Sequence, residues 1–136
     1  MSGRLKADTN LKSALQPVCE KYAGILAAVY LFGSAATGEA TFRSDLDIAL
    51  LFASGAGRFP AERQFALYAD FSRVLRRNDI DLVVLNNSQN LILQEEILRH
   101  GVLIFEGNPA ARAEYEQRTL HLGIDFRYQR AMAMGM

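Results

Sequence analysis

Two aspartates separated by one residue, Asp45 and Asp47, stand at the head of an apolar run in the segment "LFGSAATGEATFRSDLDIALLF", residues 31–52. On a β-strand, side chains two residues apart leave the same face, so these carboxylates would lie side by side. Unpaired, they would repel each other and would be costly to desolvate in a covered sheet. A divalent cation removes both penalties, and Mg²⁺ commonly shares one or two protein carboxylates with substrate phosphates. We therefore expect Asp45 and Asp47 to bind Mg²⁺ beside a phosphate-bearing substrate.

A third carboxylate is available from a later apolar run, "IDLVVL", which Asp81 opens. If this run is the neighbouring strand, Asp81 would reach the same end of the sheet as the first two acids. Asp79 lies on the same face by the period-two rule and is the rival candidate. Because Asp79 follows Arg76, Arg77 and Asn78, it is more typical of a turn at a helix exit.

Gly33 and Ser34 supply the complementary half of such a site. Glycine permits close approach of the backbone, and a serine with free N–H groups at a helix start can cradle a phosphate. Taken singly, a Gly-Ser pair is most often only a turn, and an Asp-x-Asp pair is most often a solvated strand end. Together, with ten residues between Ser34 and Asp45, they predict a phosphoryl or nucleotidyl transfer site.

The elements that must position these residues follow from hydrophobic periodicity and from glycine and proline signals. We expect helices at about 8–22, from Pro60, from a cap within 86–88 through Leu98, and from Pro109 to about Arg130, with strands at 25–32, 46–53, 81–85 and 102–105. This order predicts a single α/β domain with a small mixed sheet of about four strands flanked by helices, and a C-terminal helix. The core would span about 10–106, and residues 131–136 would form a frayed tail.

The amino-acid composition argues against several classes of function. The 136 residues carry zero formal net charge, which argues against a dedicated nucleic-acid binder. The single cysteine excludes a disulfide framework and a zinc cluster and favours a reducing, cytoplasmic setting. No apolar run approaches the length of a membrane span. Arg73, Arg76 and Arg77 are interpreted as a solvated helix face, with contact to an acidic partner or to nucleotide phosphates as the alternative. His100 is interpreted as a helix cap or surface residue.

At Gly33, Ser34, Asp45 and Asp47 the sequence resembles the nucleotidyltransferase superfamily that includes DNA polymerase β. More narrowly, it resembles the minimal nucleotidyltransferase (MNT) family, antitoxins of the MntA type that are paired with HEPN-domain toxins. The "SDLDI" core that starts at Ser44 and the later segment "EILRHGVLIFEGN" fit that family as well. The resemblance implies the nucleotidyltransferase fold.

The resemblance also implies a chemistry: two Mg²⁺ ions and transfer of AMP from ATP to a tyrosine of a HEPN ribonuclease toxin. Asp45 and Asp47 would hold both metals, and Asp81 would hold the nucleophile-side metal and help to deprotonate the hydroxyl. The triphosphate would be bound by Gly33 and Ser34, with Ser44 and Arg43 beside them. Thr37 follows Gly33-Ser34-Ala35-Ala36 where many relatives have an arginine, and Arg43 is the candidate substitute.

Two alternatives stay open at this point. The chain could be an antitoxin that inhibits its partner by binding alone, with vestigial catalysis. It could also transfer nucleotides to a small molecule, although enzymes of that kind generally need a further domain. The chain could act as a homodimer or as a hetero-oligomer with the toxin.

Overall fold

The computed structural model describes residues 3–37, 45–53 and 61–133. Its elements, in chain order, are α1 (Gly3–Lys21), β1 (Leu26–Phe32), α2 (Ser34–Thr37), β2 (Leu46–Phe52), α3 (Ala61–Leu75), β3 (Ile80–Val84), the 3₁₀ turn η1 (Leu85–Asn87), α4 (Leu91–His100), β4 (Val102–Glu106) and α5 (Pro109–Ala133).

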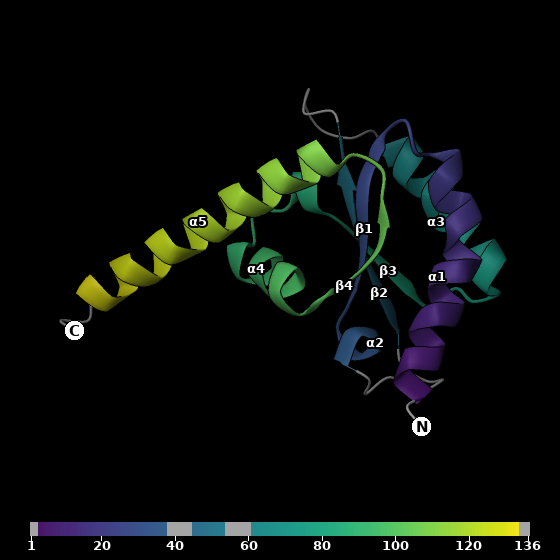
Figure 1. Cartoon of the computed structure of the whole chain (residues 1–136), viewed down its shortest axis with the longest axis horizontal. Coiled ribbons are helices and arrows are strands. Elements are labelled where there is room, and N and C mark those ends of the chain that lie inside the picture. Colours follow the sequence, from purple (N-terminus) through teal and green to yellow (C-terminus); the bar gives the residue numbers. More distant parts are fainter. Residues whose placement is uncertain (1–2, 38–44, 54–60, 134–136) are drawn as a thin grey trace.

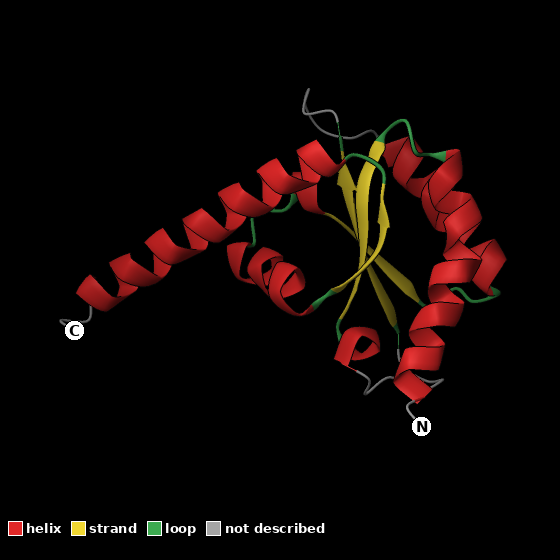
Figure 2. Cartoon of the chain, in the orientation of Figure 1, coloured by secondary structure: helices red, strands yellow, loops and turns green. Residues whose placement is uncertain are grey.

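The four strands form one mixed sheet in the order β3-β2-β1-β4. β1 pairs antiparallel with both β2 and β4, whereas β2 and β3 run parallel. Helices α1 and α3 lie on one face of the sheet, and α4 and α5 lie on the other (Figures 1 and 2). The α/β fold with a small mixed sheet and a long C-terminal helix is therefore confirmed.

The core consists of two apolar layers, one on each face of the sheet. On one face, Leu15 of α1 and Phe71 of α3 are fully buried against Ile48 and its alternate neighbours in β2. On the other face, Ile97 of α4 and Tyr115 of α5 pack with residues of β1 and β2. Because both faces of the central strands are covered, these strands read as continuous apolar runs instead of alternating ones.

Two boundaries differ from expectation at the ends of the chain. Helix α1 begins at Gly3, five residues before the expected start, and α5 continues to Ala133, three residues into the expected frayed tail. The C-terminal end of α5 projects beyond the rest of the domain (Figure 1). The expected helix start at Pro60 falls outside the described residues, which resume at Ala61.

The expected cap within 86–88 is wrong, because α4 begins later. Asn90 is the N-cap, and its side chain accepts a hydrogen bond from the backbone N–H of Leu93 (3.1 Å). Asn86 has a different role: its side-chain oxygen accepts from the Phe52 N–H (2.8 Å), and its amide donates to the Phe52 carbonyl (3.0 Å). The Asn86 side chain thus satisfies the backbone N–H and carbonyl of Phe52, the last residue of β2. Gly101 ends α4 as expected.

Within the described ranges, every helix is too short or too polar to cross a membrane.

A buried carboxylate joins α1 to α3. Asp70 is 7 % exposed, and it accepts hydrogen bonds from the Tyr22 hydroxyl (2.7 Å) and the Lys21 ammonium (3.1 Å). Arg73 pairs with its other oxygen at 3.2 Å. The hydrogen bond from Tyr22 is the main cause that lowers the pKa of Asp70 below its ordinary value of 3.8.

We expect Asp70→Asn to lower the free energy of unfolding at pH 7 by about 2 kcal/mol, the scale of hydrogen bonds to a charged group. Because the pKa of Asp70 is lowered on folding, the stabilisation is complete above about pH 4 and is lost as the pH falls below it. Urea unfolding of both proteins from pH 7 to pH 3 measures this. Glu114→Gln, at an exposed pair 3.9 Å from Arg118, is the control and should change little. A deficit of constant size across this range would contradict the assignment.

Candidate active site

Strand pairing brings the second and third aspartates together. Asp47 is the second residue of β2, and it stands directly opposite Asp81 in the parallel register of β2 with β3. Neighbouring strands lie about 4.8 Å apart, so the two side chains leave the same face as close neighbours. This is the face of α4 and α5, because Ala49 and Val83, two residues further along each strand, pack in that layer. Asp45 immediately precedes β2.

The electrostatics of the three acids are coupled. Asp47 is half-buried, whereas Asp45 and Asp81 are exposed. The pKa of Asp47 is raised above its ordinary value, first by burial and then by the neighbouring charges of Asp81 and Asp45. The protein alone therefore disfavours the charged form of Asp47. We call the cluster of Asp45, Asp47 and Asp81 at this end of the sheet the acidic corner. A cation bound at the acidic corner would favour the charged form.

Gly33 lies directly against this cluster. It follows β1, whose last residue Phe32 stands opposite Asp47, and its backbone is left-handed with φ of 70°. A Cβ atom at Gly33 would collide with the carboxylate of Asp47. Only glycine combines this backbone conformation with so close an approach. Ser34 then begins the short helix α2.

A cavity of about 420 Å³ opens beside Gly33 and Ser34. Its other walls come from Phe32 and Ala36 and, across the sheet face, from Leu93, Glu96, His100 and Gly101. Sequence reasoning interpreted His100 as a cap or surface residue and did not single out Glu96. They lie here because β1 and β4 pair antiparallel, with Leu31 opposite Val102, so the end of α4 meets the end of β1. No local sequence pattern predicts the pairing of β1 with β4.

The carboxylate of Asp79, the rival candidate for the third acid, is paired with an arginine. Its carboxylate forms a two-pronged ion pair with the Arg77 guanidinium, at 2.5 Å and 2.7 Å, which lowers the pKa of Asp79. Its backbone carbonyl accepts from the Leu46 N–H at 2.9 Å. Asp79 thus belongs to the turn before β3, as its sequence context predicts.

The three neighbouring arginines differ in their surroundings. Arg73 and Arg76 are exposed, which agrees with the expected solvated face. Arg77 does not fit that expectation, because its side chain is only 27 % exposed and is held by Asp79. The charge of Asp45 also raises the pKa of Arg77. Arg77, which the sequence pattern assigned to a solvated face, therefore lies next to the acidic corner.

Two predicted nucleotide-binding residues, Arg43 and Ser44, lie outside the described residues.

The donor set fits Mg²⁺ that arrives with a phosphate ligand. Within residues 3–37, 45–53 and 61–133, no group of three acidic, histidine or cysteine side chains forms a ready-made metal cage. Mg²⁺ does not require one, since it usually keeps several waters and takes one or two carboxylates together with substrate phosphates. Asp47, with Asp81 opposite it and Asp45 two residues before it, offers such a partial set.

The fold and this acidic corner define a nucleotidyltransferase-like domain. The family model "Polymerase beta, Nucleotidyltransferase" matches residues 13–110, and the chain belongs to this family. No protein of curated function is significantly similar in sequence.

Solved structures of MNT antitoxin complexes have the same fold. One is a toxin–antitoxin structure with AMP-PNP, at 20 % identity over 91 % of this chain and 95 % of that chain, with a TM-score of 0.71. Another is the MntA–HepT toxin–antitoxin, at 18 % identity over 93 % and 96 %, with a TM-score of 0.66. A third contains the tri-AMPylated HEPN toxin of Shewanella oneidensis in complex with MNT antitoxin, at 19 % identity over 97 % and 96 %, with a TM-score of 0.61.

We expect Gly33→Ala to lower the free energy of unfolding by about 1–3 kcal/mol, because alanine is strained in a left-handed backbone and its methyl group meets Asp47. Gly24→Ala is the matched control, since a Cβ atom there meets nothing within 4 Å. Urea unfolding measures both variants.

Part of the loss should be recovered when Gly33→Ala is combined with Asp47→Ala, which removes the colliding carboxylate. Equal effects of Gly33→Ala and Gly24→Ala, or no recovery in the double variant, would contradict the close contact.

Proposed function

We propose that this chain is an Mg²⁺-dependent nucleotidyltransferase that transfers AMP from ATP to a hydroxyl group of a protein. The candidate acceptor is a tyrosine of a HEPN-domain ribonuclease toxin, which would make the chain an antitoxin. The observation that carries the proposal is the parallel register that sets Asp47 opposite Asp81, with Asp45 electrostatically coupled to Asp47. Three acids at one sheet corner are costly unless cations and phosphates complete the site.

The proposed reaction divides two tasks among the three acids. Asp45 and Asp47 would hold the Mg²⁺ that accompanies the nucleotide, and Asp81 accepts the proton of the acceptor hydroxyl. The hydroxyl oxygen forms a bond to the α-phosphorus of ATP, the bond from that phosphorus to the bridging oxygen breaks, and pyrophosphate leaves. When bound, Mg²⁺ would neutralise the charge that develops on the phosphate oxygens.

The position of Asp81 supports its role as the proton acceptor. β3 is the outermost strand on its side of the sheet, and the side chain of Asp81 is exposed. An incoming hydroxyl can therefore reach Asp81, whereas Asp47 lies deeper, between β1 and β3. General-base positions need this access before any tuning of their pKa.

Gly33 and Ser34 are the proposed triphosphate contacts, with Arg43 and Ser44 as further candidates from the sequence. The missing side chain of Gly33 leaves its backbone adjacent to the carboxylate of Asp47. A phosphate bound there would share its metal with Asp47 without a side chain in the way. The 420 Å³ cavity beside Ser34 gives room for another part of the nucleotide.

Similarity to known proteins supports the choice of donor and acceptor. The chain belongs to a nucleotidyltransferase family, and its fold matches a toxin–antitoxin structure that contains AMP-PNP. The fold also matches the structure in which a HEPN toxin carries AMP groups. ATP is therefore the proposed donor and a HEPN-domain protein the proposed partner.

We expect Asp81→Asn to slow AMP transfer by about 10²- to 10⁴-fold, the usual scale for loss of a general base. ATP affinity should change less, because Asp45 and Asp47 remain. Asp79→Asn is the matched control two residues away, and it should leave the transfer rate nearly unchanged because Asp79 is paired with Arg77. Single-turnover transfer to the HEPN-domain protein measures both rates.

The reverse ranking of the two variants would refute the role of Asp81. If the wild-type chain silenced the HEPN-domain protein without transferring AMP to it, inhibition by binding alone would replace the proposed chemistry.

A further inference from the structure

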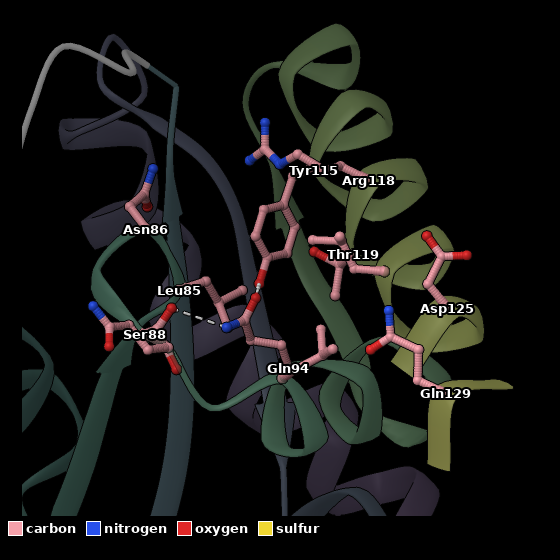
Figure 3. Close-up of a pocket in the computed structure, with 12 residues that line it drawn as sticks. Leu85, Asn86, Ser88, Gln94, Tyr115, Arg118, Thr119, Asp125 and Gln129 are labelled. Atoms are coloured by element: carbon pink, nitrogen blue, oxygen red, sulfur yellow. Dashed lines mark hydrogen bonds between the residues drawn. The ribbon is translucent and has the colours of Figure 1, made fainter. Parts of the chain in front are cut away.

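A second cavity, of about 710 Å³, lies away from Gly33, between η1, the first half of α4 and the middle of α5 (Figure 3). Its walls mix polar and apolar groups, and the polar ones come from all three elements. They include Asn86, Gln94, Arg118, Thr119, Asp125 and Gln129.

The floor of this cavity is a buried hydrogen-bonded chain. The Tyr115 hydroxyl donates to the side-chain oxygen of Gln94 at 2.9 Å, and the Gln94 amide donates to the Ser88 carbonyl at 2.9 Å (Figure 3). Burial raises the pKa of Tyr115 to about 12, so its hydroxyl stays protonated and keeps donating at neutral pH. The floor therefore ties α5 to α4 and holds the cavity in one shape.

The outermost strand connects this cavity to the acidic corner. Asp81, Val83 and Leu85 alternate along the chain on the face of α4 and α5, and Leu85 lines the cavity. Four residues of extended chain span about 13 Å, the approximate separation of Asp81 in β3 from Leu85, which directly follows β3 as the first residue of η1. α4 and α5 pack chiefly over β1. The β3 side of the face is more open, since Asp81 is exposed and Val83 is half-buried.

The chemistry of the walls favours a polypeptide over a polyanion. Among the residues that line the cavity, Arg118 carries a positive charge and Asp125 carries a negative charge. Asn86, Gln94 and Gln129 add amide groups, which can exchange hydrogen bonds with peptide groups and polar side chains. A nucleic acid that followed β3 from this cavity would meet the negative charges of Asp125 and then of Asp81.

We propose that this cavity recognises the acceptor protein, receiving a polar side chain of the same polypeptide that presents its hydroxyl to Asp81. The inference rests on the proposed function and deepens it, because it names the cavity at which the acceptor protein docks. A substrate that contacts both places must span about 13 Å, the length of four extended residues.

Leu122→Arg tests the cavity from its rim. Leu122 lines the cavity and is 50 % exposed, so a longer, charged side chain can obstruct the opening without disturbing the buried floor. The probes are the HEPN-domain protein and N-acetyl-tyrosinamide, a small tyrosine that cannot span from Asp81 to the cavity. We expect kcat/KM for the protein to fall about tenfold, mainly through KM, because an obstructed anchor pocket weakens docking. Transfer to the small acceptor should stay within about twofold.

Ile124→Arg is the matched control. It introduces the same charge on the same helix at a similarly exposed apolar residue, 56 % exposed, that does not line the cavity. It should leave both kcat/KM values within about twofold of the wild type. Melting temperatures of the two variants, compared with the wild type, check that both are folded.

The outcomes separate the two proposals. If the wild-type chain transfers AMP to neither acceptor, the proposed function fails and this inference fails with it. If the wild type modifies the protein and Leu122→Arg does so equally well, the cavity is not the recognition site, although the proposed function stands. The inference is also overturned if Ile124→Arg is as impaired as Leu122→Arg, or if transfer to the small acceptor falls in parallel.

Discussion

Repulsion between carboxylates at one corner of the sheet is the constraint on which the proposed function depends. The parallel register of β2 with β3 sets Asp47 opposite Asp81, and Asp45 adds a third charge next to them. The Arg77 guanidinium is paired with Asp79, and the charge of Asp45 contributes to raising the pKa of Arg77. Repulsion among these carboxylates lowers the stability of the folded chain. Binding of a metal-bound phosphate substrate would raise that stability again.

The surrounding chain holds this corner in place from three sides. The Asp79 carbonyl accepts from the Leu46 N–H and so sets the start of the β2–β3 pairing. On the other side, Gly33 turns the end of β1 past Asp47 in a conformation that other residues adopt only with strain. At the far end of β2, Asn86 satisfies the last backbone groups of Phe52. Strand register and acid position are therefore fixed by the same few contacts.

Much of the fold could be predicted from sequence because local signals were strong. The apolar runs gave the positions of β1 and β2 to within a residue, and Gly101 marked the end of α4. The alternation that predicts Asp45 and Asp47 on one face is likewise local. Long-range pairing was not predictable in this way. The β1–β4 register that carries His100 to the cavity beside Gly33, the ion pair of Arg77 and the cavity between η1, α4 and α5 depend on contacts between distant segments.

The most direct test of a cation-dependent acidic corner is calorimetric titration of ATP into the wild-type chain and into Asp45→Asn/Asp47→Asn, with and without Mg²⁺. We expect appreciable binding only to the wild type and only with the metal, because the carboxylates and the triphosphate repel each other without a cation between them. The double variant should melt at the same or a higher temperature, since like-charge repulsion is relieved. Metal-independent binding of equal strength, or a loss of stability as large as that of a core truncation, would contradict the cation-dependent site.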